Sequence, residues 1–445
     1  MSLLKGIDPD LLNGALTVVK TLHDHGHEAY FAGGAVRDLI LGRKVADIDV
    51  ATSAPPEEIE RFFPKTIPVG KEFGVVVVVQ DSRQYEVTTF RKESGYLNGR
   101  HPAEVHFTDA RQDVQRRDFT VNALFLDPRT EEIIDYVGGR EDLKRKLVRT
   151  VGPPGPRFEE DRLRVLRAVR FACQLGFGIE PETYQQVQNY AQKLTQVSSE
   201  RIRDELLRIL TGPDPAGGLR LLFDSGILGS ILPEVAAMQG VPQPPEFHPE
   251  GDVFEHTCLM FQFSERLSHT LALAVLLHDV GKPPTFTVQE RIRFDGHAEL
   301  GARMAQEICR RLRLSNEQIE EIVDLVKNHL RFIHVREMRE STLKRFLRKE
   351  NFGKHLELHR LDCLASHRDL SSYHFCQEKL EKFTQEAMRP QPLINGHDLI
   401  DLGLEPGPIF SDILGAVEDL QLEGKLSSKE EALEWVKGHH LTTDS

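Results

Sequence analysis

The sequence predicts an α+β protein of several domains, in which a head with a mixed sheet and helices is followed by helical domains. Apolar β-branched runs bounded by polar turns occur early in the chain, as in Val75–Val79, and this pattern is typical of strands. After Thr150 the apolar residues recur at helical spacing, and proline-rich stretches separate the helical blocks. The expected domains are a head over residues 1–150, a helical neck over 151–242, a second helical domain over 243–388 and a small helical tail over 389–445.

The composition is that of a chain with ordinary globular cores. Of its 445 residues 40% are hydrophobic, and its five cysteines are scattered without a CxxC pair. This cysteine usage favours a reducing, cytoplasmic environment over a disulfide framework. The N-terminus lacks a signal-peptide pattern and no run approaches the apolar length of a membrane span, so we expect no membrane association. The sequence gives no sign of an obligate protein partner.

The formal net charge of −13 comes mainly from the end of the chain. From Gln391 to Ser445 there are eleven acidic and three basic residues, whereas Arg331 to Arg360 carries nine basic and four acidic residues. Phosphate contacts need a local basic surface and not a basic chain. The acidic balance is therefore compatible with a nucleic-acid substrate.

A glycine pair and two aspartates lie close together in FAGGAVRDLILGRKVADIDV. In an extended strand Asp47 and Asp49 project from the same face, and their carboxylates repel unless a cation such as Mg²⁺ lies between them. Gly33 and Gly34 precede a helix-like segment, where backbone N–H groups can approach an anion. Glu86 adds a third carboxylate if its strand pairs beside the first. A phosphate cradle beside a metal clamp predicts nucleotidyl transfer.

The segment Arg116-Arg117-Asp118-Phe119-Thr120-Val121-Asn122 carries groups suited to a nucleotide. The adjacent guanidinium groups of Arg116 and Arg117 can bind a triphosphate bidentately. The amide of Asn122 is a candidate partner for a ribose hydroxyl.

Asp161 and Arg164 are three residues apart in a segment with helical spacing, so we expect them on one face of a helix. The carboxylate only accepts hydrogen bonds and the guanidinium only donates them. Cytosine and adenine each offer an amino donor beside a ring-nitrogen acceptor, whereas guanine and uracil present a carbonyl and an N–H at those places. The pair can therefore select C and A. An ordinary i,i+3 surface salt bridge is the alternative.

These motifs occur in the same order as in a known family. GGAVRD with DID, then RRDFTVNAL and EEDRLRVLRAVRF, resembles the class II tRNA nucleotidyltransferases and bacterial poly(A) polymerases, which share a polymerase-β-like head. The resemblance runs from about Tyr30 to Leu210. It implies that Asp47 and Asp49 bind catalytic Mg²⁺. It also implies that the nucleotide is handled by Gly33, Gly34, Arg37, Arg116, Arg117 and Asp118.

A different chemistry is indicated after the second proline-rich stretch. Histidines and aspartates from several helices can converge on a metal ion in the core of a bundle. Their order here, H…HD…H…H…D, resembles the HD-domain metal-dependent phosphohydrolases, which implies phosphatase or cyclic phosphodiesterase activity. Ni²⁺, Mn²⁺ and Co²⁺ suit imidazole and carboxylate ligands. The candidate ligands are His256, His278, Asp279, His297, His329 and Asp362.

Together these features predict a tRNA 3′-end nucleotidyltransferase that adds CCA, or its terminal A, from CTP and ATP. A poly(A) polymerase is disfavoured by the acidic tail, and a CC-only enzyme by the full-length segment Arg91–Pro102. An HD-domain phosphohydrolase with an inactive head is disfavoured by the intact Asp47 and Asp49. The tail segment Pro392–Ile400 resembles the tails of bacterial tRNA nucleotidyltransferases. That likeness implies a grip on the tRNA body, and a small packing domain is the alternative.

Overall fold

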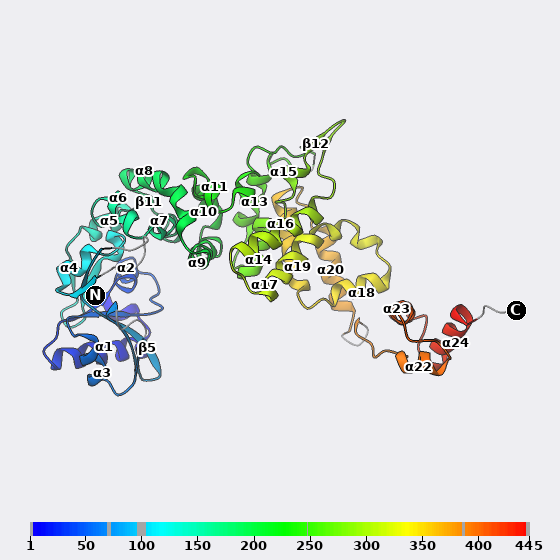
Figure 1. Ribbon diagram of the computed structural model, residues 1–445, viewed down its shortest axis with the longest axis horizontal. Coiled ribbons are helices and arrows are strands. Elements are labelled where there is room, and N and C mark those ends of the chain that lie inside the picture. The colour runs from blue at the N-terminus through cyan, green and yellow to red at the C-terminus, as the bar shows by residue number, and fades with distance from the viewer. Residues whose placement is uncertain (1–2, 69–72, 96–103, 247, 385–387, 442–445) are drawn as a thin grey trace. The chain divides into compact units, whose positions relative to one another are not determined.

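The computed structural model describes residues 3–68, 73–95, 104–246, 248–384 and 388–441. The chain forms two compact units, Met1–Ala236 and Ala237–Ser445, and each is described by itself (Figure 1). Within the described ranges no helix is both long enough and apolar enough to cross a membrane.

A seven-stranded mixed sheet forms the centre of the N-terminal unit, as predicted. Its strand order is β3-β4-β5-β2-β1-β8-β9, and β2 and β5 are its parallel pair. A separate antiparallel pair is formed by β6 (Arg91–Ser94) and β7 (Glu104–Phe107). Of the predicted segment Arg91–Pro102 the structure describes residues 91–95, and the remainder lies outside the described residues. The strands of the sheet are β1 (Ala29–Ala32), β2 (Asp49–Thr52), β3 (Thr66–Ile67), β4 (Val75–Gln80), β5 (Arg83–Thr89), β8 (Leu124–Asp127) and β9 (Glu132–Asp135).

Helices pack on this sheet through apolar faces. The N-cap Asp8 accepts a hydrogen bond from the Leu11 amide and so begins the first helix, which packs on β1 and β4 with Val18 and Leu22 buried. Figure 1 shows this helix and α3 beside β5. The helices of this region are α1 (Pro9–Asp24), α2 (Gly34–Ile40), α3 (Pro56–Phe62), α4 (Ala110–Gln115) and α5 (Gly139–Arg145).

The rest of the N-terminal unit is helical. Pro154, Pro181 and Pro215 each stand in the first turn of a helix, where the missing N–H of proline costs no hydrogen bond. The central helix α7 packs against α9 and α10 and buries Leu166 and Val169. The helices are α6 (Pro154–Glu160), α7 (Leu163–Leu175), α8 (Pro181–Tyr190), α9 (Ser199–Leu210), α10 (Pro215–Asp224), α11 (Ile227–Ile231) and α12 (Pro233–Ala236).

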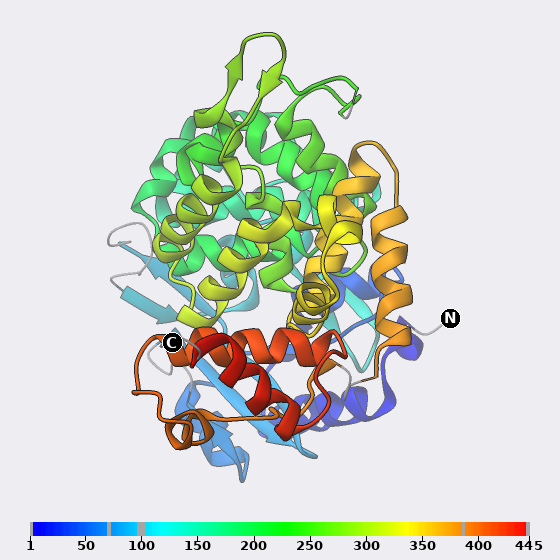
Figure 2. The same cartoon turned by 90° about the vertical axis from the view of Figure 1, so that its right-hand side faces the viewer.

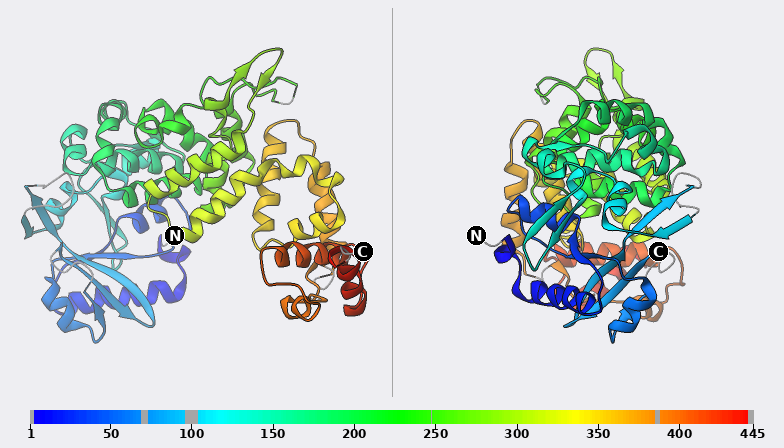
Figure 3. Two further views of the ribbon diagram at one scale, coloured as in Figure 1. Left: turned by 45° about the vertical axis from the view of Figure 1, so that its right-hand side comes forward. Right: turned by 90° about the vertical axis from the view of Figure 1, so that its left-hand side faces the viewer.

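The C-terminal unit is a helical bundle around one fully buried helix. Every residue of α14 from Thr270 to Leu277 is buried, which fits a helix that is apolar on all sides. A short hairpin of β12 (Thr287–Val288) and β13 (Ile292–Arg293) projects from the bundle (Figure 3). The helices are α13 (Val253–Phe263), α14 (His269–Leu277), α15 (Lys282–Thr285), α16 (His297–Arg311), α17 (Asn316–Asn328), η5 (His329–Glu337), α18 (Glu340–Leu347), α19 (Phe352–Ala365) and α20 (Ser371–Lys382).

The end of the chain forms a small group of helices with its own apolar cluster, seen in orange and red in Figure 2. Leu399, Ile413 and Val436 are fully buried there. The group is fixed to α18 by polar contacts, including the ion pair of Arg345 Nη2 with Glu418 Oε2 at 2.6 Å. The helices are α22 (Gly396–Asp401), α23 (Ile409–Leu422) and α24 (Lys429–His440).

Candidate functional site

One open cavity of about 520 Å³ in the N-terminal unit is lined by every residue predicted for the head and neck. Eight arginines and five carboxylates line it. It therefore offers both a place for cations and a place for anions. The predicted residues among its lining are Gly33, Gly34, Arg37, Asp47, Asp49, Glu86, Arg116, Arg117, Asp118, Asn122, Asp161 and Arg164.

Three carboxylates meet at the edge of the cavity, on and beside strands β2 and β5. Val50 pairs with Val87 in the parallel ladder, and this register places Asp49 next to Glu86. The expectation that Asp47 lies on the same strand is wrong, because β2 begins at Asp49. Asp47 is nevertheless exposed on the same side of the chain as Asp49, since the intervening Ile48 is buried and the alternation of an extended segment is kept.

The electrostatics of these carboxylates fit a bound cation. Although solvent still reaches the Asp49 side chain, partial desolvation in the pocket, together with the negative charges of Glu86 and Asp47, raises its pKa to about 7. A divalent cation among the three groups would remove that repulsion, and oxygen donors of this kind suit Mg²⁺.

The glycine pair begins helix α2, but one of its amides is already engaged. Gly33 has a φ of 65° and donates its N–H to Leu124 O at 3.1 Å. The Gly33 amide therefore has a protein partner and is not one of the N–H groups that would approach an anion. A Cβ at this position would lie 3.4 Å from Nη1 of Arg117, so glycine here allows both the backbone turn and the close approach of that arginine.

Asp113 on α4 holds the two adjacent arginines. Its Oδ1 accepts from Arg116 Nε at 2.9 Å and its Oδ2 from Arg117 Nε at 3.1 Å. The Asp113 side chain is 1% exposed, and the guanidinium of Arg117 also lies over the Phe125 ring. These contacts thus fix the orientation of both guanidinium groups in the cavity wall.

A second network connects Arg37, Asn122, Asp118 and Arg167. Arg37 Nη1 donates to Asn122 Oδ1 at 2.7 Å, and Asn122 Nδ2 donates to Asp118 Oδ1 at 3.3 Å. Although burial opposes the shift, the Arg167 guanidinium lowers the pKa of Asp118 to about 2. The Asn122 amide, expected to meet a ribose, thus has protein partners for both its oxygen and its nitrogen.

Asp161 and Arg164 both line the cavity, but the prediction of one helix through them is wrong. Helix α6 ends at Glu160, Asp161 is extended with φ −143° and ψ 104°, and α7 begins at Leu163. The break is stabilised because Asp161 Oδ1 accepts from the Leu163 amide at 3.1 Å. Arg164 follows in the first turn of α7.

Different partners hold the two side chains. Arg201 donates from Nη1 and Nη2 to Oδ1 and Oδ2 of Asp161 at 3.1 and 2.7 Å. Arg164 Nη1 donates to Glu160 Oε2 at 2.7 Å, and its Nη2 donates to the Arg116 carbonyl at 2.8 Å. The acceptor and the donor are therefore fixed separately, which gives less support to a simple salt bridge between them.

Sequence reasoning missed several cationic groups of this cavity, among them Arg91, Arg170 and Arg201. The recurrence of arginine at 164, 167 and 170 in RLRVLRAVR is a helical stripe that could have been found. Arg201, by contrast, comes from α9 and reaches the cavity only through packing.

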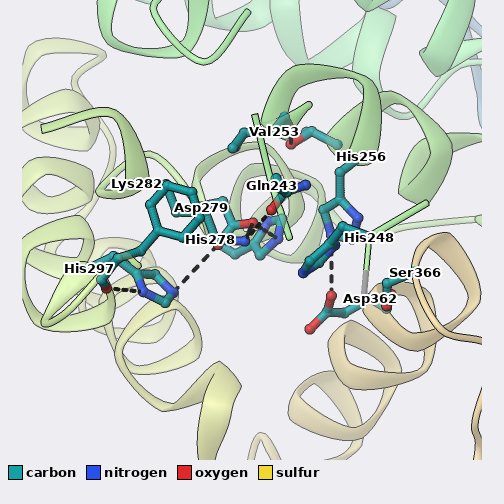
Figure 4. Close-up of polar contacts among 12 residues, drawn as sticks. Gln243, His248, Val253, His256, His278, Asp279, Lys282, His297, Asp362 and Ser366 are labelled. Atoms are coloured by element: carbon teal, nitrogen blue, oxygen red, sulfur yellow. Dashed lines mark hydrogen bonds and ion pairs between the residues drawn. The ribbon is translucent and has the colours of Figure 1, made fainter. Parts of the chain in front are cut away.

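In the C-terminal unit all six predicted ligands gather in the bundle core. Figure 4 shows His256, His278, Asp279, His297 and Asp362 there. Four of them, Asp279, His297, His329 and Asp362, line a cavity of about 1010 Å³. The residues form two groups of three, with candidate ligand atoms within 4.8 Å of one another in each group. These groups are His256 with His278 and Asp362, and Asp279 with His297 and His329.

Backbone carbonyls orient three of the four histidines. Each donates from Nδ1 to the carbonyl of the residue three positions earlier, at 2.6–2.9 Å. A carbonyl can only accept, so Nδ1 carries the proton and Nε2 presents its lone pair to the core. The pairs are His278 with Val275, His297 with Phe294 and His329 with Val326.

The unmatched polar atoms of this cluster fit a metal ion. Among the described residues, His256 Nε2, His278 Nε2 and Asp279 Oδ1 are buried and make no hydrogen bond of good geometry. Two of these atoms do lie close to carboxylates: His256 Nε2 is 3.2 Å from Asp362 Oδ1, and His278 Nε2 is 3.1 Å from Asp279 Oδ2. The other Asp279 oxygen, Oδ2, pairs with Lys282 Nζ at 2.7 Å. A set of imidazole nitrogens with carboxylates suits a first-row transition metal.

Proton binding is set by the same contacts. Burial lowers the pKa of His329 to about 4, which favours the neutral imidazole that binds metals. Burial also opposes protonation of His256, but Asp362 and Glu250 raise its pKa to about 9. Binding of an ion at His256 Nε2 must therefore displace a proton.

Comparison with known proteins agrees with this architecture. Residues 29–149 match the model of the poly A polymerase head domain, 176–239 that of a probable RNA and SrmB-binding site of polymerase A, and 253–351 that of the HD domain. The fold and the first cavity thus define a nucleotidyltransferase that carries an HD domain.

The relatives define the family more narrowly. The CCA-adding enzyme of Anoxybacillus flavithermus is 35% identical over 424 residues, which is 95% of this chain and 96% of that protein. The chain belongs to the CCA-adding enzyme family. A crystal structure of the Bacillus stearothermophilus CCA-adding enzyme with CTP aligns over 98% of both chains, with 30% identity and a TM-score of 0.70. A Thermotoga maritima CCA-adding enzyme with tRNA, 22% identical over 98% of this chain and 97% of that one, shares the fold with a TM-score of 0.61. These relatives favour CCA addition over the alternatives of a poly(A) polymerase and an inactive head.

Proposed function

We propose that this chain adds CCA, or its terminal A, to the 3′ end of tRNA from CTP and ATP. The observation that carries the proposal is one cavity in the N-terminal unit, whose lining joins three clustered carboxylates to eight arginines. CTP and tRNA are the ligands named for related structures of the family. The reaction joins the 3′-hydroxyl oxygen to the α-phosphorus and releases pyrophosphate.

Each part of the cavity has a role in this proposal. Asp47, Asp49 and Glu86 hold Mg²⁺, which when bound supplies charge stabilisation at the transferring phosphate. Arg116 and Arg117, fixed by Asp113, bind the triphosphate.

Base selection comes from a fixed acceptor and a fixed donor. The Asp161 carboxylate accepts from the exocyclic amino group of C or A, and Arg164 donates to the neighbouring ring nitrogen. The carbonyl oxygen of U or G would face the carboxylate, which leaves two acceptors without a proton between them.

The test is extension of defined tRNAs. A tRNA ending before CCA, one ending in C and one ending in CC are each incubated with CTP alone, ATP alone or both. Completion of CCA on all three, with no further addition, supports full CCA synthesis. Extension of the CC-ended tRNA alone restricts the activity to the terminal A. Addition of many adenosines or no addition at all overturns the proposal.

A second activity is proposed for the C-terminal unit, namely metal-dependent hydrolysis of a phosphomonoester or a cyclic phosphodiester. It rests on the convergence of Nε2 atoms and carboxylates in the histidine-rich cluster. Lys282 stands beside Asp279 and lines the same cavity with Arg291 and Arg293, which gives a phosphate group positive partners. The test compares hydrolysis of 2′,3′-cyclic AMP and of nucleoside monophosphates with Ni²⁺, Mn²⁺ or Co²⁺. Absence of metal-dependent hydrolysis on all of them overturns it.

A further inference from the structure

Glu250 lies in the loop before α13, outside the range matched by the HD domain model. The loop is closed by a bridge between Pro242 and Asp252, and the Glu250 side chain is only 5% exposed. Its Oε1 accepts from Nδ1 of His256 at 2.7 Å and from Nδ1 of His248 at 2.8 Å. A buried carboxylate therefore contacts His256 at Nδ1, the ring nitrogen that is not the candidate metal ligand.

This contact differs from those of the other histidines in the cluster. His278, His297 and His329 each use the carbonyl three residues earlier as the acceptor for Nδ1. The equivalent carbonyl for His256 belongs to Val253, and it accepts instead from the Thr257 hydroxyl at 3.0 Å. Figure 4 shows His256 beside His248, with its ring directed towards Asp362.

We propose that Glu250 is a positioning residue that holds His256 for metal binding, in place of the backbone carbonyl that holds the other three histidines. The inference rests on the metal site proposed above. An ionised carboxylate only accepts hydrogen bonds, so its contact keeps the proton on Nδ1 and directs Nε2 to the ion. The loop before α13 is thus part of the metal site and not only a linker.

The test measures metal affinity in the full-length chain. Wild type, Glu250→Ala and Glu250→Gln are stripped of metal, and Mn²⁺ and Ni²⁺ binding is followed by equilibrium dialysis with metal analysis. Loss of a carboxylate behind a ligating histidine costs about 10- to 100-fold in affinity, and we expect this loss for Glu250→Ala. Glu250→Gln keeps an acceptor oxygen for His256, so its loss should be smaller. The exposed Glu290→Gln is the matched control and should bind as wild type does.

The readouts separate positioning from a purely structural role. Metal-free thermal unfolding and CCA addition should change little in Glu250→Gln, because the substitution keeps the shape of the side chain. Folded Glu250→Ala and Glu250→Gln variants with wild-type metal affinity would overturn the positioning role while leaving the metal site intact. A wild-type chain that binds no ion in this cluster overturns the metal site and this inference together.

Discussion

Asp161, at the break between α6 and α7, forms a bidentate ion pair with Arg201 of α9. Arg201 Nη1 lies 3.1 Å from Asp161 Oδ1, and Nη2 lies 2.7 Å from Oδ2. The carboxylate keeps acceptor capacity, since each oxygen has two lone pairs, and its orientation is set by a residue forty positions away in sequence. Arg201 thereby determines where the proposed acceptor for the base stands.

The first prediction concerns nucleotide choice at this pair. Asp161→Ala should weaken discrimination against UTP and GTP by about ten- to hundredfold, because the clash between acceptors, worth about 1–3 kcal/mol, disappears. Arg201→Ala should weaken it in the same direction, since the carboxylate loses its support. Arg164→Ala should instead lower incorporation of both CTP and ATP. Relative kcat/KM values for the four nucleotides check all three variants.

A control for this experiment lies on the same helix as Arg201. The side chain of Arg208 is 61% exposed, so Arg208→Ala should leave nucleotide choice unchanged. If Asp161→Ala keeps the full preference for C and A, base selection does not depend on this carboxylate. Losses of stability in Asp161→Ala and Arg164→Ala without any change in nucleotide choice would indicate that their contacts with Arg201 and Glu160 are purely structural.

The second prediction concerns the carboxylates proposed to hold Mg²⁺. Asp47→Asn and Asp49→Asn should each abolish CCA addition, while the fold stays intact because each change relieves charge repulsion, which together with desolvation raises the pKa of Asp49. The measurement is single-turnover incorporation of CMP into tRNA over a Mg²⁺ titration, with circular dichroism to confirm folding. Asp81→Asn, in the turn between β4 and β5, is the control, since Asn tolerates its positive φ of 50°. Full incorporation by either site variant would remove that residue from the clamp.

How far the sequence predicts this site depends on whether a contact is local or made by packing. The glycine pair, the DID segment and the RRD segment are short motifs, and the order of helices and strands follows from apolar spacing. The spacing of Leu163, Leu166 and Val169 predicts a helix but does not indicate where that helix begins, so the break at Asp161 does not show in the apolar pattern. An aspartate that bonds to an amide two residues later favours such a break, and this competing signal decides the local structure.

Contacts between distant segments were beyond prediction from a single sequence. The sequence leaves open whether β5 pairs with β2 and so brings Glu86 beside Asp49, because nothing local determines which strands become neighbours. Arg201 reaches Asp161 through the packing of α9 on α7. Glu250 is only six residues from His256, but the sequence of a polar loop before a helix predicts only a linker. The contact with His256 becomes evident only in the folded structure.

The third prediction concerns Asp113, the buried carboxylate behind Arg116 and Arg117. Asp113→Asn should lower kcat/KM for both CTP and ATP by about ten- to hundredfold, because each arginine loses a charge-assisted hydrogen bond worth about 1.5–3 kcal/mol. The change should appear mainly in KM and should not alter the preference for C and A over U and G. Asp109→Asn tests the stability of the same helix, since Asp109 is the exposed N-cap of α4. An unchanged KM in a folded Asp113→Asn chain would contradict the positioning of these arginines.

The fourth prediction concerns acid stability of the C-terminal unit. Burial opposes ionisation of Asp324, but hydrogen bonds from His355 and Lys349 hold its pKa well below the ordinary value. A depressed folded-state pKa means that the stabilisation is present above the unfolded-state pKa, near 4, and is lost as the pH falls below it.

Asp324→Asn should therefore lower the free energy of unfolding by about 1–2 kcal/mol at pH 7. This value is reduced for solvent screening, because the side chain is one-third exposed. The difference from wild type should become progressively smaller towards pH 3. Thermal unfolding of wild type and variant between pH 7 and pH 3 measures the difference. The exposed Asp412→Asn serves as the control. A gap between wild type and Asp324→Asn that stays constant over this range would show that the carboxylate charge does not supply the stability.

The last prediction concerns the independence of the two sites. Asp279 contributes to one ligand group and His278 to the other, so changing both should remove metal binding from the whole cluster. His278→Gln with Asp279→Asn should lose metal-dependent hydrolysis and bound Mn²⁺ or Ni²⁺, yet add CCA at the wild-type rate, because every residue of the nucleotide cavity lies in the other unit. Metal analysis, hydrolysis of 2′,3′-cyclic AMP and tRNA extension are measured on one preparation. Undiminished metal content in the double variant would refute the ligand assignment, and a parallel loss of CCA addition would show that the two activities are coupled.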